Sequence, residues 1–215
     1  MEIICKDRVF TLKNGSDVLL HTDANTPMVY VGYGEERVEM YRGNFKLEDH
    51  LLERRPLTLT SARVTEQGIE LDLEGQLKLL VTEKEGAVTL TVAEKAEGIN
   101  RFWLHVEAAK DEHVYGCGEQ MSYFDLRGRH FPLWSSEPGV GRDKTTYVTW
   151  RSDVENGGAG GDYYNTNYPQ PTYVSSRHYY LHMDTTAYGD FDFRNPRYHE
   201  LQCWNVPGFI RIEAA

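Results

Sequence analysis

The chain has 215 residues, 40% hydrophobic and 26% charged, and its 33 acidic and 23 basic residues give a net charge of −10. This length suits one domain, or two at most, with a sizeable core, and it excludes a large multidomain enzyme. The charges are spread along the chain without a basic block that could follow a phosphate backbone, so we expect no nucleic acid partner.

The N-terminus and the cysteines predict a cytoplasmic protein. Residues 1–7 lack the basic region and apolar stretch of a signal peptide. No later segment approaches the roughly 18 apolar residues of a membrane span, so no membrane association is expected. Cys5, Cys117 and Cys203 are an odd set without C-x-x-C spacing. That pattern favours a reducing compartment over a disulfide framework or a zinc ribbon.

Short strands and one helix are predicted in the first quarter of the chain. Two strands, each followed by turn residues, are predicted at 8–12 and 28–33. Residues 45–55 are predicted as the one helix, ending before Pro56. Three leucines share a face of this helix: Leu47, Leu51 and Leu52.

From residue 57 to 108 apolar and polar residues alternate, which is the period of half-buried strands. Three consecutive strands are predicted at 69–73, 77–81 and 88–92. Gly75 and Gly86 stand between them and supply the positive φ that a tight hairpin turn requires. An antiparallel meander is therefore expected here.

Glycine and aromatic residues become more frequent in the second half. The glycine-rich stretch 140–161 is predicted as a long loop held by the scaffold. Strands resume at 172–174, 179–183, 191–193 and 200–204. Because strands recur and helices are nearly absent, the expected fold is all-β, a large antiparallel β-sandwich that forms one domain over residues 1–215.

The segment 115–120 combines two glycines with Glu119, and Arg127 and Arg129 follow it. Aromatic rings beside carboxylates and guanidinium groups are typical of sugar sites, because sugar C–H faces stack on indole and hydroxyls need polar partners. The structural alternative is that the glycines shape a turn and Glu119 pairs with one of the arginines to hold two loops together.

Three motifs resemble the N-terminal domain of glycoside hydrolase family 31, which holds α-glucosidases, α-xylosidases and sulfoquinovosidases. They are Tyr115-Gly116-Cys117-Gly118-Glu119-Gln120, Leu126-Arg127-Gly128-Arg129 and Leu133-Trp134-Ser135-Ser136-Glu137. Two further stretches, 138–144 and 161–173, look most like the sulfoquinovosidase branch. The resemblance implies a β-sandwich of the galactose-mutarotase-like type, in agreement with the strand pattern.

The family hydrolyses α-glycosides with retention, using one aspartate as nucleophile and another as acid/base. Both belong to a (β/α)₈ barrel that follows the sandwich, and a barrel takes roughly 250 residues. The resemblance therefore implies no catalytic residue in this chain, a barrel downstream as its partner, and no cofactor. The substrate implied is an α-glycoside, in the sulfoquinovosidase branch a sulfonated one.

The resemblance also implies a substrate-binding role for Trp134 and Glu137, on a loop that borders the sugar subsites. Glu137 stands where many relatives have Asp. Arg142, with Lys144 nearby, either helps to attract an anionic sugar or is a solvated surface cation. A surface that meets the barrel would be exposed and apolar and would invite self-association, with four expected contributors: Trp204, Val206, Pro207 and Phe209.

Other features favour simpler interpretations. His178 and His182 flank strand-like residues without a third ligand, so no metal site is expected. Cys117 near His113 is better explained as a small packed residue than as a nucleophile. The glycines of 157–161 lack the Lys-Ser/Thr of a phosphate loop.

Two rival functions share the expected fold: an autonomous carbohydrate-binding module, and a mutarotase-type epimerase with a converging His acid and Glu base.

Overall fold

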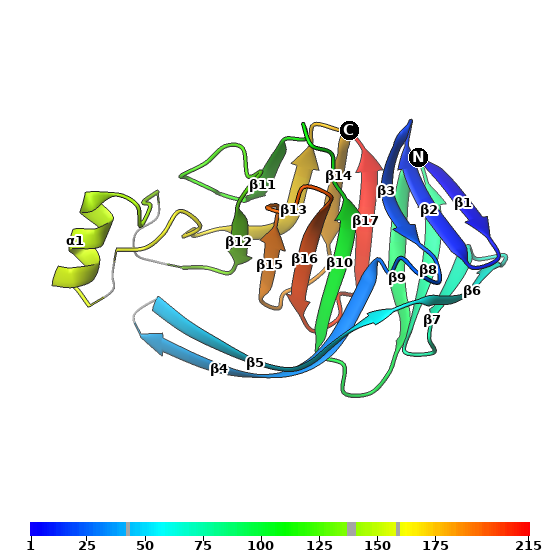
Figure 1. Cartoon of the computed structure of the whole chain (residues 1–215), viewed down its shortest axis with the longest axis horizontal. Coiled ribbons are helices and arrows are strands. Elements are labelled where there is room, and N and C mark those ends of the chain that lie inside the picture. The colour runs from blue at the N-terminus through cyan, green and yellow to red at the C-terminus, as the bar shows by residue number, and fades with distance from the viewer. Residues whose placement is uncertain (42–43, 137–140, 158–159) are drawn as a thin grey trace.

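The computed structural model describes residues 1–41, 44–136, 141–157 and 160–215, and it confirms the all-β antiparallel prediction (Figure 1). The eight-stranded sheet contains, in spatial order, β11 (Val114–Gly118), β13 (Pro169–Ser175), β14 (Tyr179–Met183), β17 (Phe209–Ala214), β9 (Ala87–Lys95), β8 (Leu77–Lys84), β7 (Ile69–Leu73) and β6 (Leu59–Val64). The six-stranded sheet contains β12 (His130–Leu133), β15 (Gly189–Asp192), β16 (Tyr198–Trp204), β10 (Arg101–Glu107), β4 (Val29–Tyr41) and β5 (Asn44–Leu57). A third sheet contains β1 (Glu2–Lys6), β2 (Val9–Asn14) and β3 (Asp17–Thr22).

The core follows from the period-2 patterns of these strands. In β10, Phe102, Leu104 and Val106 are buried in one cluster with Leu181 of β14 and Ile212 of β17. Burying each such side chain contributes about 1.5 to 3 kcal/mol. No helix among the described residues is long and apolar enough to cross a membrane.

The predicted hairpin turns are also confirmed. Lys84 pairs with Ala87 across a two-residue loop, Glu85-Gly86, and both loop residues have positive φ, 54° and 82°. That is the conformation of a type I′ turn, whose twist matches that of the flanking strands.

The helix predicted at 45–55 is wrong, because this segment is part of β5 and pairs with β4 along its whole length. The register shifts opposite Tyr33 and Gly34, where Leu52 is the extra residue of a β-bulge. A bulge interrupts the alternation of faces, so a strand can contain two adjacent apolar residues such as Leu51 and Leu52. Together with Leu47, these two leucines have the spacing of the apolar face of a helix.

The long loop predicted at 140–161 contains a helix, α1 (Tyr147–Glu155), at the left of Figure 1. The hydroxyl of Thr146 caps it by accepting a hydrogen bond from the Thr149 amide, and Arg151 pairs with Glu155 one turn later. The helix ends at Glu155, Asn156 is its C-cap, and Gly157 follows with φ 64°.

One hairpin extends beyond the sandwich. β10 pairs with β4 only from Val29 to Gly32, so residues 34–41 of β4 and 44–52 of β5 have no third strand among the described residues. We call this ribbon the arm. Its free end lies at the same end of the molecule as α1 (Figure 1).

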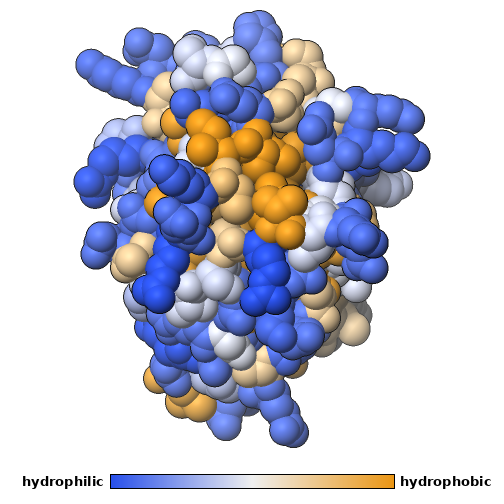
Figure 2. Space-filling view, turned by 90° about the vertical axis from the view of Figure 1, so that its right-hand side faces the viewer, coloured by the Kyte–Doolittle hydropathy of each residue, from blue (hydrophilic) through white to orange (hydrophobic). Residues whose placement is uncertain are grey.

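The C-terminal segment does not form the exposed apolar surface that was predicted. Pro207 is buried, and Trp204, Val206 and Phe209 are half-buried. The Trp204 ring packs under the Arg101 guanidinium, with Cζ 4.6 Å from the ring centroid. The exposed large hydrophobic side chains lie elsewhere. Ile4, Val9 and Val64 are among them, on β1, β2 and β6 at the end that Figure 2 shows.

Candidate functional site at the arm and the Trp134 loop

Two of the sequence motifs pack together where β11 ends. The Gly118 backbone lies so close to the next strand that an added Cβ would be 1.9 Å from the Tyr168 carbonyl oxygen, and its φ is 88°. Only glycine satisfies both conditions. The Glu119 amide donates to that same carbonyl oxygen (3.0 Å), and Thr166 Oγ1 donates to the Glu119 carbonyl oxygen (2.6 Å). Segments 115–120 and 161–173 therefore form one unit.

The 161–173 segment also fixes the start of the loop that follows β12. The Ser136 amide donates to the Thr166 carbonyl oxygen (2.9 Å), and Asn165 Nδ2 donates to Ser136 Oγ (2.8 Å). Ser135 Oγ donates to the Asn167 carbonyl oxygen (3.3 Å). Because Ser136, Asn165 and Thr166 are buried, these bonds are shielded from competing water.

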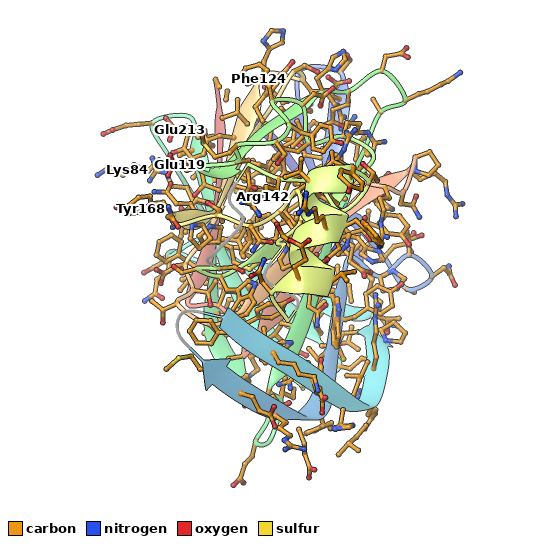
Figure 3. All side chains as sticks on the ribbon, turned by 90° about the vertical axis from the view of Figure 1, so that its left-hand side faces the viewer. Lys84, Glu119, Phe124, Arg142, Tyr168 and Glu213 are labelled. Carbon is orange, nitrogen blue, oxygen red and sulfur yellow. The ribbon has the colours of Figure 1, made fainter. Side chains whose placement is uncertain are left out.

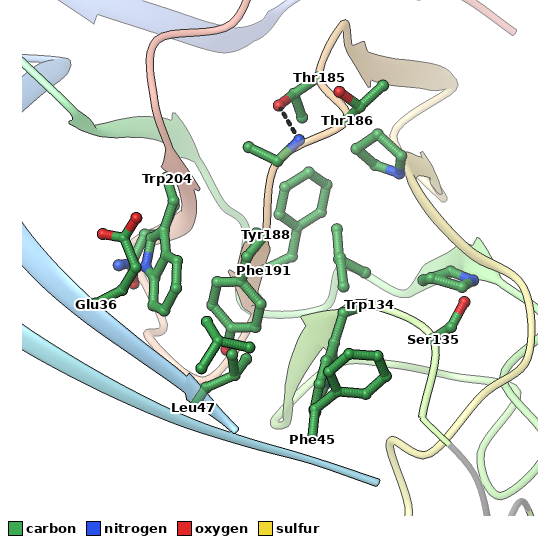
Figure 4. Close-up of a pocket in the computed structure, with 17 residues that line it drawn as sticks. Glu36, Phe45, Leu47, Trp134, Ser135, Thr185, Thr186, Tyr188, Phe191 and Trp204 are labelled. Atoms are coloured by element: carbon green, nitrogen blue, oxygen red, sulfur yellow. Dashed lines mark hydrogen bonds between the residues drawn. The ribbon is translucent and has the colours of Figure 1, made fainter. Parts of the chain in front are cut away.

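Trp134 forms part of the wall of a cleft between the arm and the body of the sandwich (Figure 4), with a volume of about 470 Å³. Its ring lies edge-on to Phe45 of the arm, with centroids 4.8 Å apart, and 6.4 Å from the Tyr188 ring. Tyr188 and Trp204 line the cleft as a second aromatic pair, 4.5 Å apart. Such walls suit a sugar ring or apolar side chains.

Phe45 and Tyr188 were not predicted as cleft residues, and Trp204 was predicted to lie on an exposed surface. The helix assigned to 45–55 hid the alternation of Phe45 and Leu47 with charged residues, which was the available signal for a half-buried strand. Tyr188 precedes β15, and the sequence around it has no alternation that would have predicted a cleft residue. Burial raises its pKa.

Of the three residues predicted to bind substrate, the structure describes Trp134 and Arg142, and Glu137 lies outside the described residues. In the part of the chain that is described, no hydrogen bond or ring contact joins Trp134 to Arg142. Trp134 belongs to the cleft, whereas Arg142 lies beside α1 (Figure 3).

The two cations of the 138–144 stretch differ in their partners. Lys144 Nζ lies 2.9 Å from a carboxylate oxygen of Asp153, on α1. Arg142 is exposed, and its Nη1 donates to Ser152 Oγ at 3.1 Å. Within the described ranges Arg142 has no carboxylate at ion-pair distance.

Glu119 does not pair with Arg127 or Arg129, so the structural alternative for this carboxylate is wrong. Arg127 donates to backbone carbonyl groups of the 193–195 segment. Arg129 lies over the Tyr123 ring, with Cζ 3.5 Å from the centroid. Both guanidinium groups are thus engaged elsewhere, and the Glu119 side chain is exposed.

One His and Glu pair, His105 and Glu200, lies on the outer face of the six-stranded sheet. His105 Nε2 lies 2.7 Å from Glu200 Oε2. The His105 ring is stacked on Tyr198, with centroids 4.0 Å apart, and Tyr30 covers it at 4.7 Å. An acid and a base must both reach the substrate, and this pair leaves no room for a sugar between them.

A second His and Glu pair lies inside the core. His199 Nε2 is 3.2 Å from Glu112 Oε1, and both side chains are fully buried. Glu112 also accepts hydrogen bonds from Ser175 Oγ (2.5 Å) and the Ala109 amide (2.9 Å). Burial alone would raise the pKa of Glu112, but His199 and these donors lower it to about 2. The cluster ties the β10–β11 connection to the core and cannot meet a substrate.

The remaining candidates have structural roles. His178 lies in the turn before β14 and His182 within that strand, where Nδ1 is 2.7 Å from Thr172 Oγ1. No group of three or more His, Cys, Asp or Glu residues in the described ranges could hold a metal ion. Cys117 is fully buried, and burial raises its pKa, which is the opposite of nucleophile activation.

Residues 5–192 match the family model of the glycosyl hydrolase 31 N-terminal galactose mutarotase-like domain. The chain belongs to this family. In neither of the two His and Glu pairs of this family 31 domain is there room for a sugar between the two side chains.

Three relatives of this family 31 domain share its sequence closely. It is 54% identical over 207 residues to a sulfoquinovosidase of Agrobacterium fabrum strain C58, covering 95% of this chain and 30% of that protein. It is 42% identical over 212 residues to a sulfoquinovosidase of Escherichia coli K12, covering 96% of this chain and 31% of that protein. A solved family 31 sulfoquinovosidase from E. rectale, in complex with an aza-sugar inhibitor, matches with a TM-score of 0.94 and 58% identity, covering 100% of this chain and 32% of that chain. The chain thus spans about a third of the length of these relatives.

Proposed function

We propose that this chain is the N-terminal domain of a retaining α-glycosidase that hydrolyses α-sulfoquinovosides. The observation that carries the proposal is the 54% identity to a sulfoquinovosidase over 95% of the chain. The two catalytic carboxylates that retention requires belong to a (β/α)₈ barrel downstream of this domain. The sugar substrate and that barrel are its partners. The free cysteines Cys5, Cys117 and Cys203 support a cytoplasmic location.

The contribution of this domain is the loop that follows β12. Trp134 lies at its start, and the buried bonds of Ser136 hold the residue directly before Glu137. A loop fixed at its base can hold a carboxylate at a sugar hydroxyl without paying the full ordering entropy on binding. We assign Glu137 and Trp134 to the border of the sugar subsites.

Arg142 is the third residue that we assign to substrate. Its guanidinium is exposed and free of carboxylate partners among the described residues, so its charge is available to an anion. A sulfonate carries a full negative charge, and charge-assisted hydrogen bonds from Arg are among the stronger polar contacts in proteins. Arg142 would thus favour a sulfonated sugar over a neutral one.

The test uses the complete enzyme with 4-nitrophenyl α-sulfoquinovoside and 4-nitrophenyl α-glucoside as substrates. Preference for the sulfonated substrate is the expected result. Replacing Glu137 by Ala leaves a sugar hydroxyl unpaired, at a cost of about 1 to 3 kcal/mol, or roughly 5- to 150-fold in kcat/KM. Glu119→Ala, at an exposed glutamate in the adjacent motif, is the matched control. Equal kcat/KM values for Glu137→Ala and wild type, at equal melting temperatures, would refute the substrate-loop assignment.

Preference for the glucoside would instead place the enzyme among the α-glucosidases of the family. The carbohydrate-binding alternative predicts a different outcome: sugar binding by the 215-residue chain itself, without turnover by the complete protein.

A further inference from the structure

Large hydrophobic side chains are exposed at the end of the molecule that carries the Trp134 loop. Among the described residues sixteen such side chains are exposed, and nine of them lie on the arm and on α1. The nine are Val38, Met40, Phe45, Leu51 and Leu52 on the arm, and Tyr147, Val148, Trp150 and Val154 on α1. Viewed from this end, α1 lies above the arm (Figure 3). Soluble proteins rarely leave such a concentration of apolar side chains in water unless it meets a partner.

The arm is amphipathic in its pairing register. Val38 faces Leu47 and Met40 faces Phe45 across the two strands, all on one face. The opposite face is charged, with paired side chains along each strand: Arg37 with Glu39, and Lys46 with Glu48. An isolated two-stranded ribbon is marginally stable in water, so a ribbon with one apolar face is expected to pack against something.

The base of the arm, where it leaves the sandwich, is held by contacts with Arg101. These contacts set the direction in which the arm extends. Arg101, 1% exposed, places Nη2 2.9 Å from Glu36 and 2.8 Å from Asp49, one residue on each strand. Its Nη1 donates to the Asn100 carbonyl oxygen (2.9 Å), and the guanidinium lies over the Trp204 ring. A buried Arg with this many partners fixes the arm at one angle to the sheet.

The apolar face of the arm is continuous with the surroundings of the substrate loop. Val38, Phe45 and Leu47 line the cleft together with Trp134, and the Phe45 and Trp134 rings are 4.8 Å apart. A domain that contacts Trp134 therefore also reaches Phe45 of the arm. The hydrophobic patch on β1, β2 and β6 has no such connection.

We propose that the arm and α1 form the docking surface for the catalytic domain that follows this chain, with apolar side chains of that domain entering the cleft beneath the arm. This rests on the proposed function. The chain spans about a third of the length of its sulfoquinovosidase relatives, so the remaining two thirds of such a protein supply a partner large enough to cover both elements. A second copy of the chain is the competing occupant. The contact between Phe45 and Trp134 favours the catalytic domain, because Trp134 is one of the residues that we assign to the border of the sugar subsites.

The test measures the exposure of Met40 and Trp150 in the complete enzyme by hydroxyl-radical oxidation and mass spectrometry. In the domain they are 62% and 56% exposed. The variant Lys84→Met supplies a matched control, an exposed strand position beside the β8–β9 turn. We expect Met40 and Trp150 to oxidise several-fold more slowly than the introduced methionine, at all protein concentrations. Equal oxidation rates overturn the proposal. Protection that appears only at high concentration assigns the surface to a second copy and also overturns it.

A second measurement uses charge. Met40→Asp in the complete enzyme places a carboxylate in a dry interface and should lower the melting temperature by several degrees, whereas Lys84→Asp should change it little. Equal shifts count against docking. Turnover of the α-sulfoquinovoside by the same preparation separates the two proposals. If the enzyme is active and Met40 is not protected, the proposed function stands and the docking surface is refuted. If Met40 is protected and the enzyme has no turnover, the docking surface stands and the proposed function is refuted.

Discussion

The strands of the meander and the strands of the arm have the same alternating pattern but different burial. In β8, Leu77, Leu79 and Val81 are buried by the opposite sheet, and β8 has a neighbouring strand on each side. On the arm, Val38 and Met40 occupy equivalent alternating positions and are 51% and 62% exposed. Because both patterns indicate one buried face, the difference teaches that no layer among the described residues covers the arm.

The two regions also use charge differently. In the body, the buried cluster around Glu112 fixes a loop against the core, and every oxygen of this carboxylate has a donor. At the arm, Arg101 fixes a ribbon that extends away from the core. The first arrangement stabilises the fold itself, whereas the second orients a surface.

The largest expected effect concerns activity. Under the proposed function the 215-residue chain alone should not hydrolyse α-sulfoquinovosides, because both catalytic carboxylates would lie in the downstream barrel and enzymatic rate enhancements correspond to at least about 8 kcal/mol. Release of nitrophenol by the purified chain, compared with buffer, is the measurement. Turnover that survives purification would place the catalytic groups on this domain. The arm would then not be the surface that joins an inactive domain to a catalytic one. We also expect the isolated chain to self-associate through its exposed apolar end.

The next effect tests the body. The pKa of Glu112 is about 2 in the folded chain against an ordinary value of 4.5. Its contribution, about 3 kcal/mol, is therefore present above pH 4.5 and is lost as the pH falls from 4.5 towards 2. Glu112→Gln should flatten the dependence of the melting temperature on pH in this window. At neutral pH it should lower the melting temperature by roughly 6 to 12 °C.

Glu119→Gln, at an exposed carboxylate, is the control for Glu112→Gln. If both variants keep the pH profile of the wild type, the buried cluster does not stabilise the fold through ionised Glu112.

A smaller effect on stability is expected at the base of the arm. Removing the guanidinium in Arg101→Met leaves Glu36 and Asp49 partly solvated, so the cost should be about 2 kcal/mol, less than for a fully buried pair. Hydrogen exchange should accelerate for amides of the arm and stay unchanged in β7 to β9. Acceleration throughout the chain would show that Arg101 stabilises the whole sandwich and not the arm.

Much of the fold was predictable from the sequence, because the meander obeys local rules. Period-2 alternation over 69–92 and the glycines Gly75 and Gly86 place three strands and their turns correctly. The arm was not predictable in the same way. The bulge at Leu52 breaks its alternation. Helix α1 was not predicted, because its N-cap, Thr146, lies in a glycine-rich stretch that indicated a loop.

Only the part of the candidate site that lies in the family motifs could be predicted from the sequence. The motifs at 115–120, 133–137 and 161–173 do meet in space, through Thr166 and Ser136. The cleft that adjoins them was not predicted, because its walls come from the arm, β12, β13, β15, β16 and the segment before β15, most of which are distant in sequence. Juxtaposition of this kind depends on sheet topology, and no local pattern encodes it.

The smallest expected effect separates two neighbouring cations. If Arg142 contacts the sulfonate, Arg142→Met removes a charge-assisted contact that is exposed to solvent, so we expect a loss of about 1 kcal/mol, or roughly fivefold in kcat/KM, for the α-sulfoquinovoside. The neutral α-glucoside should lose much less. Lys144→Met is the matched control, because Lys144 is already paired with Asp153 and should not change the ratio between the two substrates.

Salt supplies a second readout for Arg142. Added salt should reduce the preference of the wild type for the sulfonated substrate and leave Arg142→Met nearly unaffected, because salt screens exposed charges. A loss shared equally by both substrates would mean that Arg142 positions α1 through Ser152 and does not recognise the anion.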